Sequence, residues 1–324
     1  MQFFSEKKTY DLMRMRFGAI AISALLVLGS VFLFFERGLQ YGIDFSGGTQ
    51  IILKYQNQAP IAQIRELLSA KGSFQNLSVT EFGSSDEVSI RFLGSSDDLG
   101  EDIGASVGSL LKDTGEFEIR RADVVGPKVG DELRNNGLMA LLVSLIAILI
   151  YIAFRFEWRF AMAAIVTEIH DVILTLGAIM LFRIDFNLDT LAAVLTILGY
   201  SLNDKIIIFD RIREGIKTKM KQNDLALIIN ESVSATLSRT TITSGLTLAT
   251  VVILYFFGGS MIEGFSLALI VGIIVGTLSS IFVASPALLW FKFSVLNYRQ
   301  KELDKLKKAQ EKAKMRAMYE KGSV

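Results

Sequence analysis

The sequence predicts an α-helical membrane protein with six transmembrane helices and a small α+β ferredoxin-like domain between the first and second helix. Three observations lead to this fold class. Hydrophobic residues make up 51% of the 324-residue chain and charged residues only 21%, which is more apolar than a typical soluble domain. The apolar residues form six long runs. The one long polar stretch, between the first two runs, has the alternation expected of strands and helices.

Each apolar run is long enough to cross a bilayer, which takes about 20 residues in a helix. The first run follows four cations, as a signal peptide does, but no small-residue cleavage site follows it. It is therefore predicted to be an uncleaved span. The predicted spans are Phe17–Phe35, Leu138–Phe154, Phe160–Phe182, Leu188–Phe209, Thr236–Phe257 and Phe265–Phe291.

The positive charges predict the orientation of the spans. Lys and Arg residues gather before span one, between spans two and three, between spans four and five, and after span six, whereas the opposite loops are poor in them. Six crossings place all four basic regions on one side, so both termini are expected to be cytoplasmic. The predicted parts are residues 1–36 (N-terminus and first helix), 37–136 (the periplasmic domain), 137–291 (helices two to six) and 292–324 (a basic tail).

The inserted domain is expected to contain six elements in the order β-α-β-β-α-β, which is typical of a ferredoxin-like fold. No catalytic cluster stands out in it, so a binding or packing role is the simpler interpretation. The expected strands are Gln50–Tyr55, Gln75–Phe82, Glu87–Phe92 and Gly115–Val125, and the expected helices are Pro60–Leu68 and Leu99–Leu111.

Glycines mark both edges of this domain. Gly47 and Gly48 lie between the first span and the first strand, and Gly126 and Gly130 precede the second span. Glycine permits positive φ and close backbone approach. Two interpretations stay open, an ordinary linker and a hinge between the membrane part and the exposed domain.

Span four carries a polar stripe that ends in Asn203 and Asp204. Its members share one helical face, opposite an apolar face suited to lipid or apolar packing. They are Thr196, Gly199, Tyr200, Asn203 and Asp204. A charged side chain within a bilayer is costly, by at least ~2.5 kcal/mol at the centre of a helix, so Asp204 is a candidate for ion translocation. The alternative is that Asp204 only anchors the span near its cytoplasmic exit.

Span five begins near Arg239 and continues with small hydroxyl residues along one side. Arg239 is a candidate partner for Asp204, released when the aspartate takes up a proton. The alternative is an arginine that reaches out to the membrane interface.

Span three adds Glu168, His170 and Asp171 as candidates for ion translocation. Histidine titrates near neutral pH, and carboxyl groups can relay protons. A structural, paired His170 is the alternative. Glu168 and Asp171 match neither a calcium loop nor a two-metal site, so no metal cofactor is expected, although they could help bind a coupling sodium ion.

Three further segments have simpler interpretations. Gly272 and Gly276 in span six have the spacing of a helix-packing motif. Residues 223–238 are expected to form a surface helix on the cytoplasmic side, capped by Asn223 or Asp224. The tail from Tyr298 to Lys321 is expected to be a solvated helix with some attraction for anionic lipid.

Taken together, the motifs resemble the SecD/SecF family of bacterial protein-export membrane proteins over nearly the whole chain. The chain departs from the family at Lys205, where a small hydroxyl residue is common, and at Glu168. Both departures leave the identity of the coupling ion open. The matching motifs are Gly42–Gly48, Val125–Gly130, Phe154–Arg159, His170-Asp171, Gly199–Asp204 with Phe209–Glu214, Arg239-Thr240 and Glu263–Leu267.

The resemblance implies half of a transporter of the resistance–nodulation–division superfamily in the bacterial inner membrane, with SecD as the other half. It implies that a proton- or sodium-motive force acts through Asp204 and Arg239 to help move unfolded preproteins and release them on the periplasmic side. The implied neighbours are the SecYEG translocon, YajC and YidC. No cofactor other than the coupling ion is implied.

Two other function classes remain open at this stage. One is a small-molecule or lipid exporter built from two copies of this half, and the other is a purely structural assembly factor. No enzyme is predicted, because the sequence has no phosphate-binding loop, no Ser-His-Asp arrangement and no metal cluster. It also has no nucleic-acid-binding patch.

Overall fold

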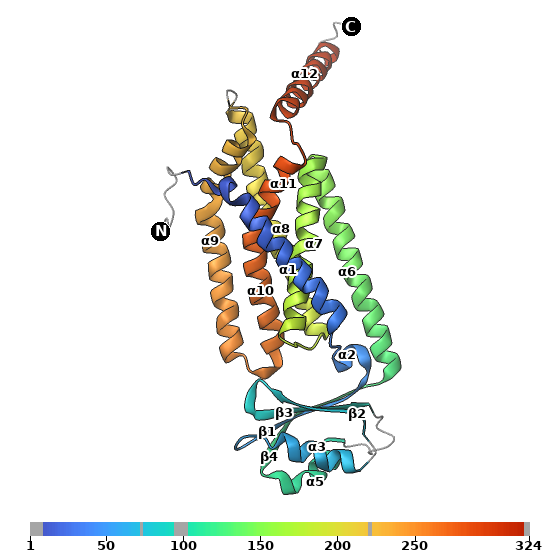
Figure 1. Ribbon diagram of the computed structural model, residues 1–324. Coiled ribbons are helices and arrows are strands. Elements are labelled where there is room, and N and C mark those ends of the chain that lie inside the picture. Colours follow the sequence, from blue (N-terminus) through green and yellow to red (C-terminus); the bar gives the residue numbers. More distant parts are fainter. Residues whose placement is uncertain (1–8, 72–73, 94–102, 220–221, 321–324) are drawn as a thin grey trace.

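The structure is a computed structural model that describes residues 9–71, 74–93, 103–219 and 222–320. Six helical spans, long and apolar enough to cross a membrane, stand side by side with an α+β domain beyond one end (Figure 1). This arrangement confirms the predicted fold class. The spans are α1 (Arg16–Glu36), α6 (Pro127–Arg155), α7 (Trp158–Leu181), α8 (Leu188–Thr218), α9 (Leu225–Phe257), and α10 (Glu263–Ser279) continued by a π-helical turn (Ser280–Ala284) and α11 (Ser285–Trp290).

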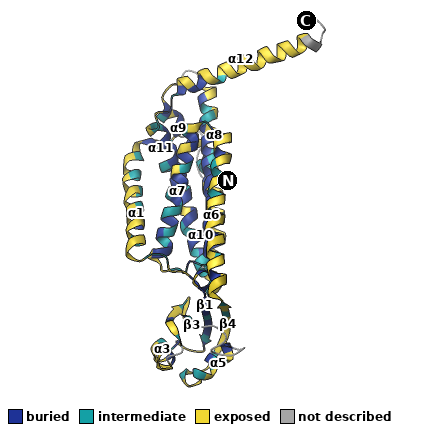
Figure 2. Ribbon diagram, turned by 90° about the vertical axis from the view of Figure 1, so that its right-hand side faces the viewer, coloured by how far each residue is buried: buried dark blue, intermediate teal, exposed yellow. Residues whose placement is uncertain are grey.

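Three of the spans form the centre of the bundle and three flank it. About half of the most apolar stretch is buried in the spans α7, α8 and α10–α11, against 6% in α1, 11% in α6 and 17% in α9. Figure 2 shows the same contrast, with α1 mostly exposed and α7 mostly buried. The lateral surfaces of α1, α6 and α9 are therefore free for lipid or for a partner.

Glycines allow the central helices to pack closely, as predicted for the helix-packing motif of Gly272 and Gly276. A Cβ atom on Gly272 would lie 2.2 Å from Ile197 of α8, and one on Gly276 would lie 2.8 Å from the Ser201 hydroxyl. Real side chains do not tolerate such contacts. The side chains of α8 therefore pack directly on the backbone of α10 at these glycines. Gly177 has the same role between α7 and Ser30 of α1.

The inserted domain has the predicted order of elements. Its strands form one sheet with the order β2-β3-β1-β4, and all neighbouring strands are antiparallel. This is the topology of the ferredoxin-like fold. The elements are β1 (Gly48–Tyr55), α3 (Ile61–Ala70), β2 (Gln75–Phe82), β3 (Ser84–Leu93), α5 (Ile103–Leu110) and β4 (Phe117–Val125). Residues 99–102 of the second predicted helix lie outside the described residues.

The two faces of the sheet have different neighbours. Alternate residues of a strand point to opposite faces. On β1, Ile51 and Leu53 belong to the hydrophobic core under α3 and α5, whereas Gln50 and Ile52 line a cavity toward the bundle. Figure 1 shows the sheet between its own helices and the membrane helices.

The predicted edge glycines meet in one tight joint. Gly47 and Gly48 have φ of +69° and +114°, which favours glycine over other residues. A Cβ atom on Gly130 would lie 2.7 Å from the Gly47 nitrogen, so the segment before β1 crosses directly over α6. Gly126 is the N-terminal cap of α6, with open space around it. The joint is closely packed rather than a loose linker.

One predicted boundary is wrong. The separate surface helix over residues 223–238 does not exist, because α9 is one helix of 33 residues that begins directly after its cap, Asp224. No glycine or proline interrupts it before Gly245, and Ile229 and Val233 are buried in the same core cluster as α8. Helix α6 begins at Pro127, so it contains the predicted span Leu138–Phe154 and also Gly130.

Two further helices lie at the end of the bundle away from the sheet. A short 3-10 helix (Leu12–Met15) precedes α1, and α12 (Val295–Glu320) projects from the bundle (Figure 1). Helix α12 is highly exposed, as predicted for the tail, but Arg299 is buried and donates to the carbonyls of Ile216, Lys219 and Gln222. This side chain therefore ties the start of α12 to the loop between α8 and α9.

Candidate functional site

Asp204 lies where α8 packs against α9. Its residue is only 1% exposed, and its carboxylate accepts a hydrogen bond of 3.2 Å from the Ser244 hydroxyl. One turn earlier on α8, the Tyr200 hydroxyl donates to Thr247 of α9 over 3.4 Å. The two predicted lines of polar residues therefore meet along one contact between these helices. Asp204 is a buried, ionisable group within the span α8.

The polar stripe of α8 turns outward, away from the centre of this chain. Thr196, Gly199 and Asn203 are exposed, whereas the apolar residues Ile197 and Leu198 are buried inside the bundle. On α9, Arg239, Thr243 and Thr250 are exposed as well. The outward stripe, called the α8–α9 polar face here, consists of Thr196, Gly199, Tyr200, Asn203, Arg239, Thr243, Thr247 and Thr250.

The predicted pair between Asp204 and Arg239 is not formed. Among the residues that the structure describes, the Asp204 carboxylate accepts from Ser244 and forms no ion pair with Arg239. Ser244, which does contact Asp204, follows Arg239 by five residues, and five residues turn a helix by about 140°. Arg239 therefore points away from the contact between α8 and α9 while Ser244 points into it.

The predicted residues of α7 form a second site, around Lys205. The Lys205 side chain is fully buried, and its ammonium donates to Glu168 over 2.6 Å, to Asp171 over 2.8 Å and to the Ser201 hydroxyl over 2.7 Å. Ser201 and Ser279 also donate to Asp171. We call Glu168, Asp171, Ser201 and Lys205 the α7–α8 cation cluster.

His170 connects this cluster to α1. Its Nδ1 atom lies 2.9 Å from the Asp171 carboxylate, and its Nε2 atom lies 2.5 Å from the Ser23 hydroxyl. The histidine thus has partners on both ring nitrogens and bridges a peripheral helix to a central one. A chain of hydrogen bonds of this kind can pass a proton between its members.

Sequence reasoning placed Glu168, His170 and Asp171 on one site but missed Lys205 and Ser23 as their partners. One signal for Lys205 was present. Two carboxylates on one span need a nearby cation. Lys205 is a cation on the next span, four residues or one turn after Ser201. Ser23 gave no such signal, because it lies among many apolar residues of α1.

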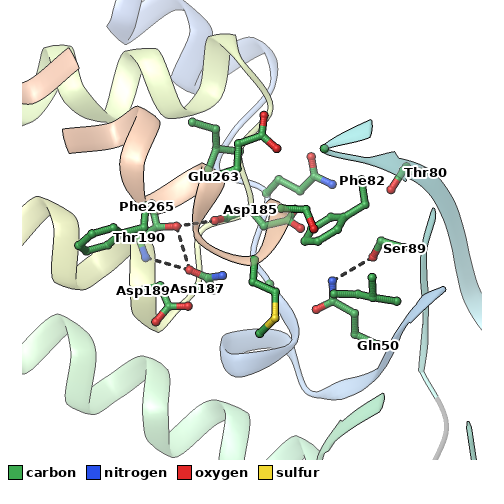
Figure 3. A pocket seen from close by; sticks show the side chains of 18 of the residues that line it. Gln50, Thr80, Phe82, Ser89, Asp185, Asn187, Asp189, Thr190, Glu263 and Phe265 are labelled. Atoms are coloured by element: carbon green, nitrogen blue, oxygen red, sulfur yellow. Dashed lines mark hydrogen bonds between the residues drawn. The ribbon is translucent and has the colours of Figure 1, made fainter. Parts of the chain in front are cut away.

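The junction between the sheet and the bundle contains a cavity of about 450 Å³ (Figure 3). At this cavity, Arg91 of β3 forms a 3.0 Å ion pair with Asp185, which lies in the loop between α7 and α8. Burial raises the pKa of Asp185, and Arg91 partly offsets this effect. Asp44, from the predicted glycine-rich motif, accepts from the Leu188 nitrogen at the start of α8. The domain is thus attached to the same helix that carries Asp204 and Lys205.

Comparisons with known proteins agree on one family. The model of "Protein export membrane protein SecD/SecF, C-terminal" matches residues 106–294, and that of the "SecD/SecF GG Motif" matches residues 32–59. The chain is similar to the protein translocase subunit SecF of Helicobacter pylori, with 44% identity over the full length of both, and to that of Vibrio alginolyticus, with 46% identity over 88% of this chain and 90% of the relative.

The fold is also that of a solved relative. The crystal structure of SecDF from Thermus thermophilus, described as a translocon-associated membrane protein, matches with a TM-score of 0.81 and 35% identity. The match covers 90% of this chain and 40% of the Thermus chain. The chain similarly covers 37% of the protein translocase subunit SecDF of Brucella abortus, at 43% identity. In these fused relatives the likeness to this chain therefore spans less than half of the molecule.

Proposed function

Because the chain belongs to the SecD/SecF family of protein-export membrane proteins, we propose that it couples an ion gradient to preprotein export as one half of a SecD–SecF complex. The family is that of protein translocase subunits, and its two halves are fused into SecDF in some relatives. The observation that carries the proposal is the buried Asp204 beside an outward polar face.

The α8–α9 polar face supports SecD as the partner. Exposed polar side chains within a span rarely face lipid and usually face protein or water. In transporters built from two halves, the ion and substrate sites lie near the midplane at the interface between the halves. We infer that SecD covers this face, so that Asn203 and Arg239 lie near the interface and Asp204 directly behind it.

The coupling ion is a proton or a sodium ion in this proposal. Asp204 binds it, Asn203 lies beside its path, and Arg239 moves toward Asp204 when the aspartate is charged and unoccupied. His170, Asp171 and Glu168 relay protons on the other side of α8. Export uses the joint around Gly47 and the link from Asp44 to α8, through which a shift of α8 reaches the α+β domain.

The orientation follows the charges. Arg155 and Arg211 lie at the end of the bundle away from the sheet, which is the cytoplasmic end by the positive-inside rule. The α+β domain is then periplasmic, where it meets preprotein that leaves the channel. Lys7, Lys8 and Lys221, which contribute to the same charge pattern, lie outside the described residues.

The complex would act beside the SecYEG translocon, with YajC and YidC as further neighbours. The description of the Thermus relative as translocon-associated supports this placement. A small-molecule or lipid exporter made of two copies is not favoured, because the full-length relatives are translocase subunits.

The proposal is tested by export in cells that carry Asp204→Asn or Arg239→Met. Both variants are expected to reduce preprotein secretion to the level seen when the ion gradient is dissipated, because the ion-binding carboxylate or its counter-charge is gone. Asp189→Asn, in the exposed first turn of the same helix, is the matched control and is expected to export normally. Normal secretion by both test variants would contradict the proposal.

A further inference from the structure

The ammonium of Lys205 fills a site built for a cation. A lysine ammonium has three N–H donors. Here each donor has its own oxygen acceptor within 2.6 to 2.8 Å, on Glu168, Asp171 and Ser201. The side chain is fully buried, so water takes no share in this arrangement. Helices α7 and α8 supply the oxygens, and Lys205 itself lies on α8.

The surrounding oxygens are the kind that hard metal cations prefer. Carboxylate and hydroxyl groups are the usual ligands of such ions. Asp171 is held in place by Ser201 at 2.5 Å and by Ser279 at 2.8 Å, so its orientation does not depend on Lys205 alone. Gly276 lets α10 approach Ser201 closely enough to close this side of the site.

The cluster has more carboxyl groups than ammonium groups. Glu168 and Asp171 both contact Lys205. The second oxygen of Glu168, Oε1, is buried and has no hydrogen-bond partner among the described residues. A buried acceptor without a donor is costly, so this oxygen is available to a cation that takes the place of the ammonium.

We propose that the α7–α8 cation cluster is a sodium site closed by the chain's own lysine. The Lys205 ammonium occupies the position of the ion, which makes the cluster unresponsive to sodium in this protein. Replacing the lysine with a small hydroxyl residue opens a site for sodium between Glu168, Asp171 and Ser201. The proposal concerns cation binding alone, and it stands or falls independently of whether the chain drives export.

The proposal is tested with Lys205→Ser, purified in detergent and unfolded by heat. Sodium chloride is varied against choline chloride at constant ionic strength. Binding to the folded state alone raises the unfolding temperature with ligand concentration. The variant is expected to gain several degrees with rising sodium, and the wild type none. Lys217→Ser, which removes an ion-paired lysine at the exposed end of the same helix, is the matched control and is expected to behave like the wild type.

A second variant covers the case in which Lys205→Ser does not fold without sodium. Glu168→Gln with Lys205→Ser leaves one buried carboxylate, so it is expected to fold and to show a weaker sodium response.

Three results would overturn the proposal. The first is the absence of a sodium-specific shift in both variants. The second is stabilisation of Lys205→Ser by acid alone, which would mean that protons replace the lysine. The third is a sodium response of the wild type that Glu168→Gln abolishes.

Discussion

Two adjacent ionisable residues of α8 face different helices. Asp204 accepts from Ser244 of α9, whereas Lys205 donates to Glu168 and Asp171 of α7. Consecutive residues of an α-helix are about 100° apart around its axis, so this separation is a direct result of helix geometry. It keeps the lysine occupied by its own carboxylates and leaves Asp204 beside the polar face.

At the sheet–bundle junction, replacing Arg91 is expected to cost more stability than replacing its ion-pair partner Asp185. Arg91→Met leaves a buried carboxylate without its cation and is expected to lower the free energy of unfolding by about 1–3 kcal/mol at neutral pH. Asp185→Asn removes the group that resists burial and is expected to cost less. The unfolding temperatures of both variants, measured in detergent, check this order.

The pH dependence of Arg91→Met follows from the raised pKa of Asp185. A carboxyl group whose pKa is raised on folding binds a proton more readily in the folded state, so acid favours folding in the window just above its ordinary value. The cost of Arg91→Met is therefore expected to shrink as the pH falls toward that window. Two results would contradict this account. One is a loss of stability in Arg91→Met that stays constant with pH, and the other is the same pH dependence in Asp185→Asn.

At the scale of residues, the sequence was informative about chemistry but not about contacts. Glu168, Asp171 and Asp204 were predicted from the cost of a charge within a span, and His170 from the general chemistry of histidine. The structure places all but His170 among the buried residues. The partner of the α7 carboxylates was missed, because periodicity gives a residue's face and not the helix packed against it.

At the scale of elements, helix α8 packs with its apolar face inward and its polar face outward. Ile197 and Leu198 are buried against the bundle, and Gly199 and Asn203 are exposed. The sequence predicted both faces, and the structure shows which one meets the rest of the chain. A span with an exposed polar face is incomplete as a membrane surface, which favours a second protein half beside it.

The contact between α8 and α10 depends on Gly276. Gly276→Ala puts a Cβ atom 2.8 Å from Ser201, which holds both Asp171 and Lys205, and is expected to lower stability by about 1–3 kcal/mol. Gly245→Ala, on the exposed side of α9 with open space around it, is the matched control. It is expected to keep or raise stability, because alanine favours helix. Equal unfolding temperatures for the two variants would show that the close packing is not needed.

The predicted elements of the inserted domain were confirmed because their strands and helices have distinct periods and clear turns. The predicted surface helix over residues 223–238 is instead the first part of α9, which carries Ser232 and Ser234. In the structure these hydroxyls are buried and donate to backbone carbonyls within α9 or on α8. Hydroxyl residues satisfied in this way do not mark the end of a buried helix.

At the scale of the whole molecule, the exposed domain is attached to the start of α8, the helix that carries Asp204 and Lys205. The joint of Gly47 with Gly130 lies at the start of α6. The hydrogen bond from Leu188 to Asp44 lies at the start of α8, and the ion pair of Arg91 with Asp185 lies just before it. The sequence could not predict this junction, because it forms between residues far apart along the chain. Movement of α8 on ion binding would reach the domain through these contacts.

The central claim is that Asp204 carries the coupling ion, and cation flux tests it most directly. The chain and its SecD partner are reconstituted in liposomes, and a pH gradient and a sodium gradient are imposed separately. The account predicts flux down one of the two gradients that Asp204→Asn abolishes and that Asp189→Asn leaves intact. Equal flux through the wild type and Asp204→Asn would contradict it.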